Sequence, residues 1–147
     1  MKSYKEKLNK IESSFSDKLK IKLKLETLRN LLNKIATNED EQLNERLDRL
    51  FEELDEILKQ DKPSLRTYLK KINDIKKYVK EKWGYVAKGT LVGEYMAMGM
   101  AIGLAMATAF VSINPALISI GLPIGIAVGL SIGNHKENEL EKEGKIY

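Results

Sequence analysis

The chain has 147 residues, of which 43% are hydrophobic and 31% charged, and its formal net charge is +4. It has no cysteine and a single histidine, His135, so a disulfide framework, thiol catalysis and most histidine-based metal chemistry are excluded. The charged half also lacks paired catalytic carboxylates, nucleophile elbows and phosphate-binding loops. We therefore predict a protein that is not an enzyme and requires no metal or cofactor.

Charge is distributed unevenly along the chain. From Met1 to Trp83 nearly every helical turn is charged, whereas Glu94 is the only charged residue between Leu91 and Gly133. The first thirty residues lack the apolar region of a signal peptide. We expect internal apolar segments to direct membrane insertion.

The first predicted helix covers roughly residues 3–36. Its apolar residues form two stripes whose phase slips near residues 13–17, the first with Tyr4, Leu8, Ile11 and Phe15, the second with Ile21, Leu25, Leu28, Leu32 and Ile35. Between them, residues 18–25 alternate lysine with an aliphatic residue, a period that alone would suggest a strand. No partner strand is evident, so we predict helix and interpret the lysines as a solvated face, with nucleic-acid or lipid binding as alternatives.

Two further helices complete the predicted N-terminal domain, residues 1–84. One apolar stripe begins at Leu43 and a second at Leu65; the first contains Leu43, Leu47, Leu50, Leu54 and Ile57, widened by Phe51 and Leu58, and the second contains Leu65, Leu69, Ile72, Ile75 and Val79. A polar turn at residues 37–40 and a break at residues 62–64 separate the helices. We predict a three-helix bundle or coiled coil.

Two apolar stretches follow, Leu91–Val111 and about Pro115–Gly133, with a turn signal at Asn114 and Pro115. Each is close to the ~20 residues needed to cross a bilayer. We predict an all-α protein with a two-helix transmembrane hairpin at residues 85–134 and a charged tail at residues 135–147.

Small residues recur every four positions in both stretches. The second stretch has Gly121, Gly125, Gly129 and Gly133; the first has the row Gly89, Gly93, Ala97, Ala101, Ala105 and Ala109 and a second row Gly99, Gly103 and Ala107. In lipid, such rows promote close backbone approach between helices. One row can pair within the hairpin and another between subunits, and we favour a homo-oligomer over packing within a monomer alone.

Repeats such as those of residues 98–103 and 120–125 resemble the small glycine-zipper membrane-hairpin proteins of Gram-positive bacteria. The resemblance covers about residues 89–134. It implies a membrane hairpin and no defined activity.

Basic residues flank both apolar stretches, whereas the turn between the stretches carries no charge. The positive-inside rule then predicts a multi-pass protein of the cell membrane with both termini cytoplasmic. Trp83, Tyr85 and Lys88 are predicted to anchor the hairpin at the membrane interface.

Glu94 is the candidate intramembrane polar residue, which is predicted to line a pore, to pair with Lys88 or to reach water near the interface. Four methionines lack the cysteine or histidine partners of a soft-metal site, so we interpret them as lipid-facing or gap-filling: Met96, Met98, Met100 and Met106. We predict a membrane protein that self-associates through its glycine zipper and presents its helical domain to a cytoplasmic protein; nucleic acid is not expected as a partner. The alternatives are a pore-forming or membrane-disrupting effector and a soluble protein that hides its hairpin until triggered.

Overall fold

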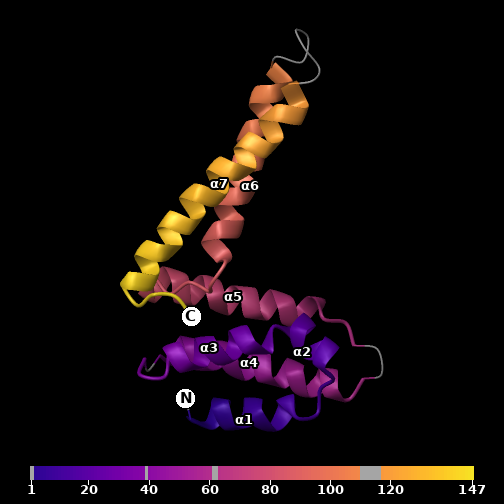
Figure 1. Cartoon of the computed structure of the whole chain (residues 1–147). Helices are drawn as coiled ribbons and strands as arrows, with labels where there is room; N and C mark the ends of the chain where they lie inside the picture. The colour runs from indigo at the N-terminus through magenta and orange to yellow at the C-terminus, as the bar shows by residue number, and fades with distance from the viewer. Residues whose placement is uncertain (1, 39, 61–62, 110–116) are drawn as a thin grey trace. The chain divides into compact units, whose positions relative to one another are not determined.

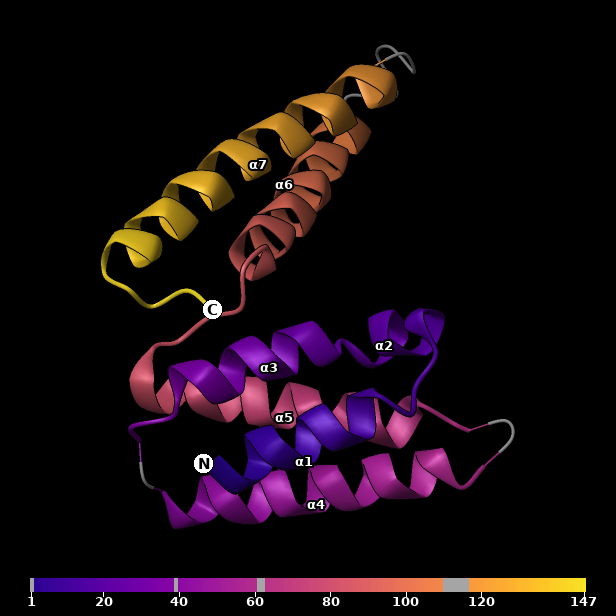
Figure 2. The same cartoon turned by 60° about the horizontal axis from the view of Figure 1, so that its bottom comes forward.

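The computed structural model describes residues 2–38, 40–60, 63–109 and 117–147. Over these residues the protein is all-α, with seven helices and no strand (Figure 1, Figure 2). The helices divide into two compact units, one formed by Met1–Tyr85 together with Tyr147 and the other by Val86–Ile146. We call the first the bundle and the second the hairpin.

The predicted continuous helix at residues 3–36 is wrong: the structure has α1 (Lys2–Glu12), α2 (Asp17–Leu23) and α3 (Leu25–Lys34). The first interruption falls where the apolar stripe slips. The second is at Lys24, which adopts a left-handed conformation with φ 53°, uncommon for a residue other than glycine. The neighbouring leucines, Leu23 and Leu25, account for this break. In a continuous helix, residues two apart lie on nearly opposite sides, so only one of the two could face the core. The break at Lys24 allows both to be buried.

Ile21 is therefore not part of the buried stripe predicted for it, and 77% of its surface is exposed. Leu19, on the same short helix, packs against the bundle core instead. In the alternating run, leucines occupy the positions that face the bundle core, and Ile21 faces away from it.

The other two helices of the bundle lie close to the predicted positions, as α4 (Glu41–Leu58) and α5 (Arg66–Trp83). The whole predicted α4 stripe is buried except Leu58, which is 37% exposed. Asp40 precedes α4 but makes no side-chain cap hydrogen bond. Lys62, in the predicted break before α5, lies outside the described residues, as does Asp61 before it.

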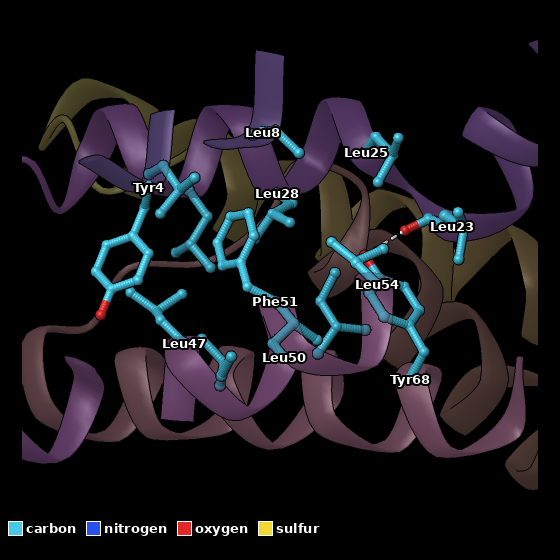
Figure 3. Packing of buried hydrophobic residues seen from close by; sticks show 14 of the residues in the cluster. Tyr4, Leu8, Leu23, Leu25, Leu28, Leu47, Leu50, Phe51, Leu54 and Tyr68 are labelled. Carbon is cyan, nitrogen blue, oxygen red and sulfur yellow. Dashed lines mark hydrogen bonds between the residues drawn. The ribbon is translucent and has the colours of Figure 1, made fainter. Parts of the chain in front are cut away.

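The bundle core is continuous across its five helices. Tyr68, which the predicted stripe of α5 omits, is fully buried, and its hydroxyl donates a 2.8 Å hydrogen bond to the carbonyl oxygen of Leu23 at the end of α2 (Figure 3). That carbonyl belongs to the last turn of a helix and has no partner within it. Tyr68 therefore fixes the short helix α2 against α5.

The hairpin consists of α6 (Thr90–Ala109) and α7 (Leu117–Lys142), which lie side by side along their lengths (Figure 1, Figure 2). The predicted turn at Asn114 and Pro115 lies outside the described residues. Helix α7 continues to Lys142, well beyond the apolar stretch, and contains Pro123. Residues 135–142, which were predicted as part of a separate tail, thus form the last turns of α7.

Candidate functional site

Helices α6 and α7 meet backbone to backbone. A Cβ atom added at Gly121 would lie 2.6 Å from the Cβ of Ala107, and one added at Gly133 would lie 2.7 Å from the Cα of Val92. Both separations are shorter than real Cβ contacts allow. At six glycines an added Cβ would lie too close to an atom of the other helix. We call these six the glycine contact: Gly99, Gly103, Gly121, Gly125, Gly129 and Gly133.

The contact is reciprocal at its centre. An added Cβ on Gly99 would overlap the carbonyl oxygen of Gly125, and one on Gly125 would overlap the carbonyl oxygen of Gly99. Each carbonyl thus lies where a side chain would start, a geometry suited to Cα–H···O contacts between helices. The glycine contact therefore depends on the absence of side chains.

The predicted row of small residues that begins at Gly89 is not part of this contact, whereas Ala107 lies against Gly121. A Cβ added at Gly89 or Gly93 would meet nothing within 4 Å, and Ala97, Ala101 and Ala105 are exposed. Positions two apart on a helix are separated by about 200°, so the row that contains Ala97, Ala101 and Ala105 lies on the side away from Gly99 and Gly103. We call Gly93, Ala97, Ala101 and Ala105 the outer small-residue row.

Long apolar side chains are exposed on both helices of the hairpin. Among the described residues, all large exposed hydrophobic side chains except Ile21 and Leu58 lie on α6 or α7: Met98, Met100, Ile102, Leu104, Met106, Ile120, Ile124, Val128 and Ile132. Met98, Ile102, Ile124 and Val128 are among the walls of a groove of about 440 Å³ with glycines in its lining. A two-helix unit with this surface needs an apolar medium or an apolar partner.

By length and composition, α6 is the one helix in the described ranges able to cross a membrane. Its 20 residues correspond to about 30 Å at a rise of about 1.5 Å per residue, the thickness of a hydrocarbon core. Only a small share of its apolar window is buried in the protein. The helix is thus exposed where a core helix of a soluble protein would be covered.

The base of the hairpin is closed by polar contacts. The backbone N–H of Gly89 donates a 2.6 Å hydrogen bond to Oε1 of Glu137, and the N–H of Val86 donates a 2.9 Å hydrogen bond to the carbonyl of Lys145. Lys88 Nζ lies 3.9 Å from a carboxylate oxygen of Glu141. The predicted anchor Lys88 and the packing candidate Gly89 therefore belong to this base.

Glu94 is exposed near the N-terminal end of α6. His135 is exposed on α7, with its Nε2 3.4 Å from Glu139. Met98, Met100 and Met106 are exposed and Met96 is half-buried. No group of three potential metal-binding side chains occurs among the residues that the structure describes.

The aromatic anchors predicted for the membrane interface, Trp83 and Tyr85, are half-buried and pack against the bundle core. Their rings are stacked with centroids 6.5 Å apart. The ring of Trp83 also meets the ring of Tyr78 edge-on at 6.2 Å. Packing within the bundle is therefore one function of these aromatic residues.

Sequence reasoning missed a polar cluster beside these rings. Oδ2 of Asp40 accepts hydrogen bonds from the hydroxyl of Tyr78 at 2.6 Å and from Nζ of Lys82 at 2.9 Å. These bonds hold the pKa of Asp40 below its usual value, and the same carboxylate raises the pKa of Lys82. Because Asp40 is far from the other two in sequence, no local pattern indicated the cluster.

Comparison of this chain with protein-family models, with curated proteins and with solved structures finds no match.

Proposed function

We propose that the protein is a non-enzymatic two-pass membrane protein, in which α6 and the apolar part of α7 cross the bilayer as a hairpin. The observation that carries this proposal is the exposure of long apolar side chains on both hairpin helices. A lipid bilayer supplies the apolar medium for such a surface, and helices associate in it through close backbone contact.

The second part of the proposal is self-association through the outer small-residue row. The glycine contact is already used between α6 and α7, whereas Ala97, Ala101 and Ala105 are exposed. A row of small residues allows a helix of another copy to approach closely. The bundle then serves as a cytoplasmic domain that contacts a protein partner, with both termini on the cytoplasmic side.

Membrane insertion is tested by fractionating cells without detergent. We expect the full chain in the membrane fraction, resistant to extraction at alkaline pH. Recovery as a soluble monomer would overturn the proposal.

Self-association is tested by crosslinking in native membranes. Ala101→Leu adds bulk to the outer small-residue row and should reduce the crosslinked dimer several-fold. The matched control, Ile102→Leu, replaces an exposed isoleucine with a side chain of equal volume and should leave the amount of dimer unchanged. Only monomers with the unmodified chain, or equal dimer in both variants, would contradict the proposed interface.

A further inference from the structure

The helix α2 and the residue that follows it form a basic surface with an apolar centre. Lys18 and Lys22 are exposed, as is Lys24, and Ile21 among them is 77% exposed, the highest value of any exposed large hydrophobic residue in the described ranges. We call Lys18, Lys20, Ile21, Lys22 and Lys24 the α2 patch.

The backbone of the bundle holds Ile21 in this exposed position. Leu23 and Leu25 are buried on either side of the left-handed Lys24, and Tyr68 bonds the carbonyl of Leu23. Rotating α2 to bury Ile21 would withdraw Leu23 from the core and break that bond. The exposure of Ile21 is thus fixed by its neighbours.

Acidic side chains border one side of the α2 patch, because Glu12, Asp17 and Glu26 line the same surface hollow as Ile21. Asp17 pairs with Lys20 at 3.0 Å, but within the described part of the chain no ion pair engages Lys18, Lys22 or Lys24. Lys76 of α5 is a further cation nearby: its partial burial lowers its pKa, and the charge of Lys24 lowers that pKa further. A surface that gathers like charges in this way favours a polyanionic partner.

We propose that the α2 patch binds the surface of an anionic lipid bilayer, with Ile21 entering the headgroup region and the lysines contacting lipid phosphates. Lysines around an exposed aliphatic residue are the composition of a membrane-surface segment. Sites that bind single-stranded nucleic acid commonly contain aromatic side chains on which the bases stack. The α2 patch contains no aromatic residue. The inference rests on the proposed function only in that the inserted hairpin keeps a bilayer within reach.

Because the 147-residue chain contains no cysteine, a single labelled cysteine permits a direct test on the whole of this chain. An NBD fluorophore is attached at Ile21→Cys, and the labelled protein is reconstituted in nanodiscs of phosphatidylcholine alone or mixed with phosphatidylglycerol. On the anionic discs we expect a blue shift of emission and at least about a twofold loss of quenching by iodide, both reversed by high salt.

Two controls make the assignment specific. The double change Lys18→Gln and Lys22→Gln in the labelled protein should abolish the response while leaving the circular dichroism spectrum unchanged. A label at Leu58→Cys should not respond, because this exposed position lies in a hollow where three carboxylates outnumber two lysines, with lining residues Asp48, Glu52, Asp55, Lys7 and Lys10. A response of equal size at Leu58, or one that survives the lysine changes, would overturn the proposal.

The remaining outcomes are also decisive. Equal emission and quenching on both kinds of disc would overturn the inference while leaving the hairpin proposal intact. A response to a duplex DNA oligonucleotide on neutral discs, without one to anionic lipid, would assign the patch to nucleic acid and overturn it likewise. A protein that never enters the discs would contradict the proposed function instead, and anionic liposomes added to that soluble protein would still test the patch.

Discussion

Glu137 of α7 accepts a hydrogen bond from the backbone N–H of Gly89 immediately before α6, across 48 positions of the chain. Only 8% of Glu137 is exposed, and its Oε2 is buried without a hydrogen-bond partner among the described residues. A carboxylate beside a helix N-terminus is stabilised by the helix dipole. A capping-box glutamate bonds the backbone in the same way from within its own helix.

Glu137→Ala should therefore loosen the base of the hairpin. Gly89 is exposed, so the change removes a hydrogen bond to a charged group, which contributes about 1.5–3 kcal/mol. We expect hydrogen exchange at Gly89 to accelerate at least about tenfold, measured by mass spectrometry in nanodiscs. Glu139→Ala removes an exposed carboxylate of the same helix and should change nothing; unchanged exchange in Glu137→Ala would contradict the role of the contact.

The sequence predicted much of the bundle, for a physical reason. Leu43, Leu47 and Leu54 recur at the period of one helix and need only one apolar face, so their burial follows from spacing alone. Residues 18–25 obey a different period, and the break at Lys24 resolves the conflict by a backbone conformation that no propensity indicates. The alternation itself was the signal that a single straight helix could not bury both Leu23 and Leu25.

In the hairpin, spacing could not distinguish the two small-residue rows of α6. Both repeat every four residues, and only the position of α7 assigns Gly99 and Gly103 to the contact while leaving Ala101 outside. Gly89 shows a further limit of the sequence pattern. It belongs to the predicted row, yet its φ is +81° and a Cβ there would meet nothing within 4 Å, so it serves the turn before α6.

The glycine contact predicts a sharp difference between two glycine-to-alanine changes. Gly125→Ala places a methyl group against backbone atoms of Gly99 and Gly103, whereas Gly93→Ala places one in open space. The first should push the helices apart and destabilise the hairpin by about 1–3 kcal/mol, the usual cost of overpacking. The second should be neutral or slightly stabilising, because alanine has the higher helix propensity.

Distances between spin labels on α6 and α7 would check this comparison in nanodiscs. We expect the distribution of distances between the labels to be longer or broader in Gly125→Ala than in the unmodified chain. In Gly93→Ala we expect it to be unchanged. Identical distributions and identical stability in the two variants would show that the backbone contact is not formed.

The Asp40 cluster predicts a pH dependence of bundle stability. Because the pKa of Asp40 is lowered on folding, its contribution is complete above its unfolded value of about 3.9 and is lost as the pH falls through the lowered folded value. The pKa of Lys82 is raised, so its contribution is lost only as the pH rises through that raised value. Asp40→Asn should therefore be less stable than the unmodified chain near neutral pH and equally stable in strong acid.

Denaturant titrations followed by the fluorescence of Trp83 can measure this, since it is the single tryptophan and lies beside Tyr78. Asp74→Asn removes the exposed partner of Arg46 and serves as a control on the same face. A stability difference for Asp40→Asn that is as large in strong acid as at neutral pH would show that the carboxylate charge is not its source.

Tyr68→Phe tests the attachment of α2 to the core. The phenol is fully buried, burial raises its pKa, and its hydroxyl satisfies the carbonyl of Leu23. Phenylalanine keeps the ring packing but leaves that carbonyl unpaired, so we expect a loss of about 1–2 kcal/mol in the free energy of unfolding. Tyr85→Phe, on a half-buried ring that makes no hydroxyl bond among the described residues, is the matched control.

Because α2 is attached by the hydrogen bond between Tyr68 and Leu23, amide exchange in residues 18–23 should rise in Tyr68→Phe before the rest of the bundle opens. A uniform rise across α3 and α4 would show instead that α2 unfolds only with the whole core.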